Sequence, residues 1–178
     1  MLEALTLSIS RSAALDPLIM PLLQTLAVNI NLAVFDNNNH TQILRSFICP
    51  SLAKFSLITC GRWSRKILEI LKKQYNMEEL RGFEFKGPFA LHVSPFLRSA
   101  PMLHSFSLRL AVLDDEAIIG ISNGSLGRFL RRLEIQTNGD VGDLFGVVVV
   151  TRTKDRTGYE ERIIALKEAG IAIKILIS

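Results

Sequence analysis

The chain has 178 residues, of which 48% are hydrophobic and 21% charged, with a formal net charge of +4. This length and composition predict a single folded domain spanning residues 1–178, which a longer protein could also contain as a fragment. No apolar run reaches the roughly 18 residues of a membrane span, and the N-terminus lacks the pattern of a signal peptide. Two cysteines, Cys49 and Cys60, are too few for a disulfide scaffold, and we expect both to be reduced and buried. We therefore expect an intracellular protein, cytoplasmic or nuclear, without a membrane partner.

An apolar pattern recurs six times, with apolar residues at a first, a fourth and a sixth position. The copies begin 21 to 29 residues apart, at Leu2, Leu23, Leu52, Leu80, Leu103 and Leu130. Leucine-rich repeats have similar periods and carry Asn or Cys at the position eight after the first leucine. Three copies have Asn or Cys at that position, namely Asn31, Cys60 and Asn138. The register was chosen on the apolar residues alone, so this agreement is independent of it. Three copies also have a proline two residues before their leucine, which ends the incoming segment: Pro21, Pro50 and Pro101.

Between the strands we expect helices and loops, in the following order. Residues 36–40 form a polar loop, and residues 64–75 form the clearest helix, with an apolar stripe at Ile67, Leu68, Leu71 and Tyr75. Residues 114–121 begin with acidic side chains suited to a helix N-terminus. A charged connection at 151–158 leads into a helix through residue 169, which starts with a capping box. Alternating apolar residues at 171–177 then predict a seventh strand.

These patterns together predict an α/β fold of the leucine-rich-repeat solenoid type. Its irregular repeats of roughly 21–29 residues place parallel strands on the concave side and helices on the convex side. The alternative is an ordinary α/β domain with leucine-rich strands. Stacked repeats build long surfaces instead of enclosed clefts, so the fold favours a binding function.

Catalytic motifs are not supported by the sequence. The G-x-S-x-G pattern at residues 120–124 fails as a hydrolase site, because all three histidines precede Ser122 and a helix is expected before it. The cysteines lack the spacing of a metal site, and no phosphate-binding glycine loop is present. We therefore predict no enzyme activity, no cofactor and no metal.

The repeat register predicts the residues that line the concave face. In the first half of the chain these residues are mostly small or neutral, whereas in the second half they become charged. The predicted protein-binding residues are Lys54, Arg81, Glu84, Lys86, His104, Arg109, Arg131, Arg132, Glu134 and Gln136. This mixed but net basic set suits an acidic or phosphorylated protein segment, because Arg binds carboxylate and phosphate in bidentate fashion.

Two alternative functions are weighed against protein binding. A basic nucleic-acid-binding domain is favoured by the positive net charge, but Glu84 and Glu134 interrupt the basic residues and no aromatic residues alternate with them. A small α/β enzyme whose site no motif reveals is the third possibility. The isolated charges also have a simpler interpretation, which is that they only solvate the surface.

The Pro-x-Leu-x-x-Phe-x-Leu strands, the pair Asp114-Asp115, and the stretch from Leu130 to Ile135 resemble the leucine-rich region of fungal F-box proteins. The similarity extends over nearly the whole chain and concerns spacing and composition. It implies a substrate receptor of a Skp–cullin–F-box ubiquitin ligase. No residues precede the first repeat to form an F-box, so the resemblance implies an adaptor partner only if an F-box is supplied elsewhere.

Overall fold

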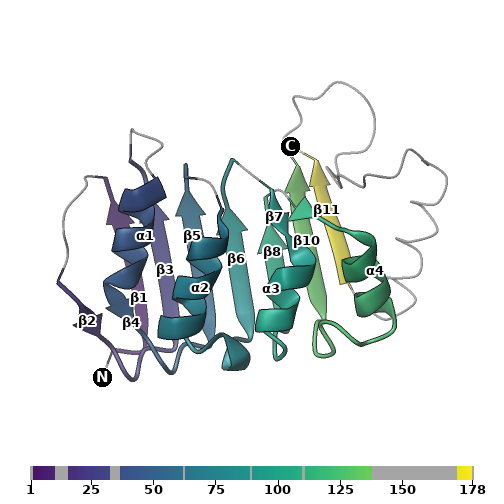
Figure 1. Cartoon of the computed structure of the whole chain (residues 1–178), viewed down its shortest axis with the longest axis horizontal. Coiled ribbons are helices and arrows are strands. Elements are labelled where there is room, and N and C mark those ends of the chain that lie inside the picture. The colour runs from purple at the N-terminus through teal and green to yellow at the C-terminus, as the bar shows by residue number, and fades with distance from the viewer. Residues whose placement is uncertain are drawn as a thin grey trace.

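The computed structural model describes residues 2–10, 16–32, 37–61, 63–88, 90–109, 111–137 and 172–177. These residues contain a seven-stranded sheet, in which the order of the strands follows their order in the chain. Each neighbouring pair is parallel. The strands are β1 (Ala4–Ile9), β3 (Thr25–Ile30), β5 (Lys54–Thr59), β6 (Gly82–Lys86), β8 (Ser105–Leu108), β10 (Arg132–Thr137) and β11 (Ala172–Ile177) (Figure 1). The protein is therefore an α/β fold built on a parallel sheet.

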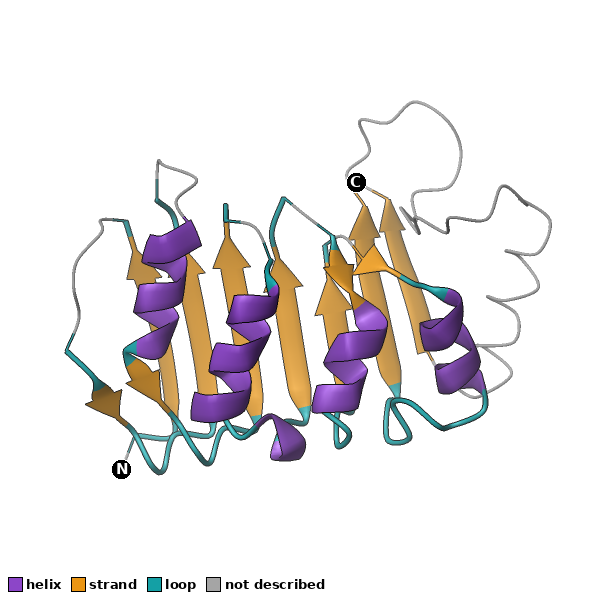
Figure 2. Cartoon of the chain, in the orientation of Figure 1, coloured by secondary structure: helices purple, strands orange, loops and turns teal. Residues whose placement is uncertain are grey.

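The described helices form a second layer on one face of this sheet. They are α1 (Asn37–Arg45), α2 (Arg65–Gln74), the 3₁₀ helix η1 (Met77–Glu79), α3 (Val93–Ser99) and α4 (Asp115–Ser122). Figure 2 shows α1 to α4 side by side in front of the strands. Short strands pair next to them: β2 (Leu18–Ile19) with β4 (Phe47–Ile48), and β7 (Leu91–His92) with β9 (Ala111–Val112). Among the described residues no element covers the opposite face, which we call the open face.

Two rows of apolar side chains cross the sheet on the helix-covered face. One row joins the fourth positions of the copies, in register, through Leu5, Leu26, Phe55, Phe83, Phe106 and Leu133. The other joins the sixth positions through Leu7, Val28, Leu57, Phe85, Leu108 and Ile135. All of these are buried except on the edge strand β1, where Leu5 and Leu7 are half-buried. The register predicted from the apolar pattern is thus confirmed.

The same backbone hydrogen bonds recur before successive strands. The N–H of the first-position leucine donates to the carbonyl three residues earlier, as in Leu52 to Cys49 at 3.2 Å and Leu80 to Met77 at 3.3 Å. The carbonyl of the next residue then accepts two N–H groups from the following copy. For example, the Ala53 carbonyl accepts hydrogen bonds from the N–H groups of Arg81 and Gly82, at 2.8 and 3.0 Å. This arrangement repeats at Glu3, Gln24, Arg81 and His104.

The helix predictions are confirmed at two places and wrong at one. Helix α2 runs from Arg65 to Gln74 with its predicted apolar stripe buried, and α4 starts after Asp114, whose side chain accepts from the Ala117 N–H at 2.7 Å. The predicted loop at residues 36–40 is wrong, because Asn37–Arg45 is helix α1. Its buried Ile43 and Leu44 pack into the core, and this packing outweighs the low helix propensity of the asparagines. Strand β11 confirms the final strand, whereas Asn138, the connection at 151–158 and the helix ending at 169 lie outside the described residues.

The two cysteines are not joined in a disulfide. Cys49 is buried as predicted, and this burial raises the pKa of its thiol to about 11. Cys60 is only half-buried, contrary to prediction, because it lies at the end of β5. Its thiol donates to the Leu32 carbonyl at 3.0 Å and so ties the end of β5 to the backbone of the preceding copy. In the described part of the chain, no helix is both long and apolar enough to cross a membrane.

Candidate binding surface on the open face of the sheet

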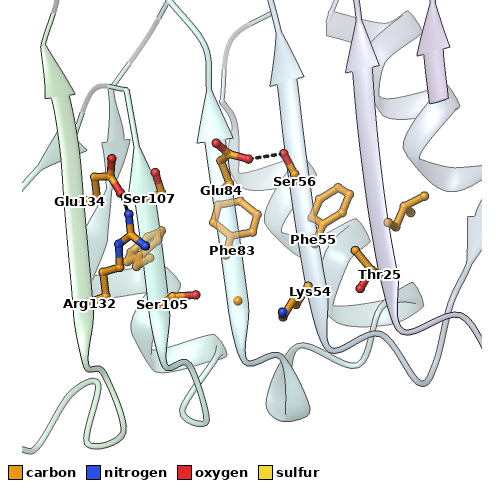
Figure 3. Close-up of a pocket in the computed structure, with 13 residues that line it drawn as sticks. Thr25, Lys54, Phe55, Ser56, Phe83, Glu84, Ser105, Ser107, Arg132 and Glu134 are labelled. Carbon is orange, nitrogen blue, oxygen red and sulfur yellow. Dashed lines mark hydrogen bonds and ion pairs between the residues drawn. The ribbon is translucent and has the colours of Figure 1, made fainter. Parts of the chain in front are cut away.

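A groove of about 340 Å³ crosses the open face between β3 and β10. Figure 3 looks onto this face, with the helices behind the sheet. The polar side chains that line the groove come from alternate strand positions, between the buried apolar rows. They are Thr25, Lys54, Ser56, Glu84, Ser105, Ser107, Arg132 and Glu134. Because side chains of a strand alternate between its faces, one pattern creates both the core and this surface.

Gly82 forms the floor of the groove. It lies in register between Lys54 on β5 and Ser105 on β8. A Cβ atom added at Gly82 would lie 3.2 Å from the Ser105 Oγ and 3.3 Å from the Lys54 Cγ. The missing side chain therefore lets the side chains of Lys54 and Ser105 approach the Gly82 backbone closely, as is typical of glycines within strands.

Both carboxylate oxygens of Glu84 are held on this face. Lys86 contacts Oε1 at 2.8 Å. The Ser56 hydroxyl donates to Oε2 at 2.7 Å, as Figure 3 shows. Burial raises the pKa of Glu84, but the hydrogen bonds from Lys86 and Ser56 and the charge of Lys86 outweigh it, so the pKa is lowered. Glu84 is therefore a fixed, ionised acceptor at neutral pH.

A second ion pair lies on β10, where the Arg132 guanidinium contacts the Glu134 carboxylate at 2.5 Å. The Glu134 side chain is 9% exposed and that of Arg132 is 57% exposed, so the carboxylate is buried under an accessible cation. As with Glu84 and Lys86, the partners are two residues apart on one strand and point to the same face. Two of the lysine and arginine side chains predicted for this face, Lys86 and Arg132, are thus compensated by carboxylates.

The structure brings together only part of the predicted binding set. Lys54, Glu84, Arg132 and Glu134 line the groove, and Lys86 is joined to it through Glu84. Three predicted residues directly precede their strands and so lie at the N-terminal ends of the strands: Arg81, His104 and Arg131. Arg109 directly follows β8, and Gln136 occupies a position on β10.

The side chain of His104, at the N-terminal end of β8, is fixed by two neighbouring residues. Its Nδ1 is 2.7 Å from the Met102 carbonyl, and its ring stacks on Phe129 with centroids 6.1 Å apart. Sequence reasoning did not single out Gly82, Ser105 and Ser107. The repeat register would have placed all three on the open face, because they flank the buried Phe83 and Phe106.

The described residues contain no group of three or more His, Cys, Asp or Glu side chains that could hold a metal ion. The Ser122 hydroxyl of the G-x-S-x-G pattern donates to the Ile119 carbonyl at 3.0 Å, at the end of α4. His40 is buried with its Nε2 4.0 Å from the Cys60 sulfur, while the Cys60 thiol proton is directed to Leu32. That cysteine is thus placed as a hydrogen-bond donor.

The geometry defines an α/β protein with a parallel sheet, one layer of described helices and a polar groove on the other face. Comparison of the chain with known protein families, with curated proteins and with solved structures gives no match. Function must therefore be inferred from the surface itself.

Proposed function

We propose that the chain is a leucine-rich-repeat solenoid that acts as a non-catalytic protein-binding module through its open face. The observation that carries this proposal is the one-sided arrangement of the described elements, with strands in chain order and helices on a single face (Figure 1). Parallel sheets of most α/β proteins are covered on both faces. A sheet that follows chain order and is open on one side provides the extended surface with which stacked repeats bind partners.

The recurring local geometry supports the repeat part of the proposal. Each strand from β3 to β10 adds two buried apolar residues to the same two rows. The carbonyl that accepts two N–H groups recurs at one position of successive copies. An ordinary α/β domain does not need such equivalence between strands, whereas a stack of similar units does.

The groove favours a protein segment that carries an acidic or phosphorylated side chain. Lys54 lines it and makes no ion pair among the described residues, while Ser105, in register with Gly82, and Ser107, in register with Glu84, add hydroxyl groups to its lining. These groups suit an incoming carboxylate or phosphate. The held carboxylates of Glu84 and Glu134 in the next row add acceptors for backbone or side-chain donors of the same segment.

Binding of nucleic acid through this face is less well supported. Phe55, Phe83 and Phe106 are buried, so the open face lacks aromatic platforms on which bases stack. The carboxylates of Glu84 and Glu134 would repel a phosphate backbone. By the resemblance to F-box proteins, the partner would be a ubiquitination substrate, with the F-box supplied by another chain or segment.

The test is affinity capture with two matched double variants. Ser105→Arg with Ser107→Arg fills the groove on the open face. The control, Ser99→Arg with Ser122→Arg, makes the same chemical change at the last residues of α3 and α4. We expect the open-face variant to lose its specific protein partners by roughly tenfold or more, since blocking a binding centre costs at least 1–2 kcal/mol.

Circular dichroism and melting curves verify that both variants fold. Equal capture of the same proteins by both variants would contradict binding through the open face. Captured material that disappears after nuclease treatment would support the nucleic-acid alternative instead. A turnover assay has no place in this test, because the proposal assigns no catalytic residue.

A further inference from the structure

We propose that the groove between α1 and α2, on the helix-covered side, binds a small anion that carries two phosphate groups roughly 10 Å apart. The groove has a volume of about 420 Å³, which lies within the size range of small-molecule sites. It is lined by residues from α1 and α2 and lies on the side of the sheet away from the open face. The inference does not rest on the proposed function.

The charges that line this groove are predominantly positive. Four cations line it, together with a single carboxylate, that of Glu69. The cations are Arg45, Arg65, Lys66 and Lys73. All four are exposed, and none makes an ion pair within the part of the chain that the structure describes. This contrasts with the open face, where Lys86 and Arg132 are both compensated.

The four cations form two pairs at opposite ends of the groove. Arg65 and Lys66 occupy the first turn of α2, and Lys73 lies about 10 Å further along at a rise of 1.5 Å per residue. Arg45 ends α1 beside the end of α2, as the contact between the Tyr75 hydroxyl and the Leu44 carbonyl at 2.7 Å shows. Each end therefore offers one arginine and one lysine, and two phosphate groups at that spacing would engage both.

The first pair is not explained by the stability of the helix. The N-terminus of a helix carries partial positive charge, so cations in the first turn are unfavourable there. Helix α2 nevertheless starts with Arg65 and Lys66, has no acidic residue in its first turn, and receives no side-chain hydrogen bond from its N-cap Ser64. Departures from such helix preferences tend to occur at functional sites. Here the positive charges of Arg65 and Lys66 add to the partial positive charge of the helix N-terminus, and both attract an anion.

Gln74, the last residue of α2, also lines the groove, directly after Lys73. Two cation pairs about 10 Å apart along the helix fit a small molecule with two phosphate groups, such as a sugar bisphosphate, better than inorganic phosphate.

The test is isothermal titration calorimetry of the full chain with fructose 1,6-bisphosphate and, separately, with fructose 6-phosphate. We expect one site, with the monophosphate bound roughly tenfold or more weakly, because charge-assisted hydrogen bonds to one phosphate are lost. Arg65→Gln with Lys66→Gln should weaken bisphosphate binding by a similar factor. The control Arg98→Gln with Arg128→Gln removes the same charge outside the groove and should change the affinity less than about twofold.

Folding of the variant is checked by its melting temperature without ligand. This temperature should be equal to or above that of the parent, because the substitutions remove cations from a helix N-terminus. Equal affinity for monophosphate and bisphosphate, or equal loss in both double variants, would overturn the proposal. So would binding of only a single-stranded oligonucleotide or of anionic lipid vesicles, since either would show a general polyanion surface instead of a site for a small ligand.

Discussion

The two faces of the parallel sheet are made by alternate residues of the same strands, yet they differ in chemistry. On the helix-covered face, Phe55, Phe83 and Phe106 form a row of neighbouring rings, with the Phe83 and Phe106 centroids 5.8 Å apart. On the open face, the residues beside them are small, hydroxylic or charged. Large apolar side chains thus form the core on one face, whereas the other face carries smaller or polar side chains that do not contribute to it.

The distribution of charge sharpens this comparison. On the open face, Lys86 and Arg132 lie beside carboxylates two residues away on the same strand. On the helix layer, the cations around the groove between α1 and α2 have no ion partner among the described residues. Two cations of the open face are thus compensated by carboxylates, whereas the described residues around the helix groove leave an excess of positive charge.

The largest effect is expected from Phe83→Ala. Phe83 is 2% exposed and contacts the rings of Phe55, Phe96 and Phe106. Its truncation should lower the free energy of unfolding by about 3–5 kcal/mol, through lost burial and the cavity that remains. Urea denaturation followed by circular dichroism measures this change.

The matched open-face substitution is Ser107→Ala, one strand away and on the other face. It should change the free energy of unfolding by no more than about 0.5 kcal/mol. A loss of comparable size at both positions would show that the open face is part of a second core, and the distinction between the faces would fail.

A smaller effect on the covered side is expected from Tyr75→Phe. The Tyr75 ring packs on Phe55 at 5.1 Å between centroids, and its hydroxyl donates to the Leu44 carbonyl at 2.7 Å. Removing only the hydroxyl should cost about 1–2 kcal/mol in unfolding free energy while the ring packing persists. Burial raises the pKa of Tyr75, so the folded parent resists ionisation that the unfolded chain undergoes.

The sign of the pH dependence follows from that raised pKa. The stabilising contribution of Tyr75 is complete below the unfolded pKa and is lost as the pH rises towards the folded one. The parent should therefore lose stability more steeply above about pH 10 than Tyr75→Phe does. Parallel stability curves for the two proteins in alkali would contradict this account.

Much of the core was predictable from the sequence because it depends on spacing. The fourth and sixth positions of each copy had to share a face, and the sheet places them in register from Leu5 to Leu133 and from Leu7 to Ile135. The helix at Arg65–Gln74 was evident from its apolar stripe. Helix α1 was not predicted, since its polar first turn suggests a loop and only the packing of Ile43 and Leu44 stabilises it.

The candidate binding surface was predictable in position but not in detail. The sequence located Lys54, Glu84, Arg132 and Glu134 on one face, and the structure places them around the groove. The ion pair between Glu84 and Lys86 was predictable, because side chains two residues apart on a strand point to the same face. The close approach of Lys54 and Ser105 to Gly82 depends on contacts between elements, which spacing alone does not provide. The same holds for the cations between α1 and α2, which make no ion pair within the described part of the chain.

An effect smaller than that of Tyr75→Phe is expected on the open face, from Lys86→Gln. Lys86 and the Ser56 hydroxyl lower the pKa of Glu84 against the opposing effect of burial. Losing the ammonium group should raise that pKa, measured from the side-chain carboxyl chemical shift during an NMR titration. The cost in stability at neutral pH should stay below about 1 kcal/mol, because the pair is partly exposed to solvent.

The pH dependence of stability distinguishes an electrostatic role of Lys86 from a packing role. A carboxyl group with a lowered folded pKa stabilises the protein above its unfolded pKa, and the contribution is lost as the pH falls through the folded value. The difference in stability between the parent and Lys86→Gln should therefore be present at neutral pH and vanish in acid. A difference that persists in acid would mean that Lys86 acts through the packing of its aliphatic stem, and that Glu84 is not held by charge.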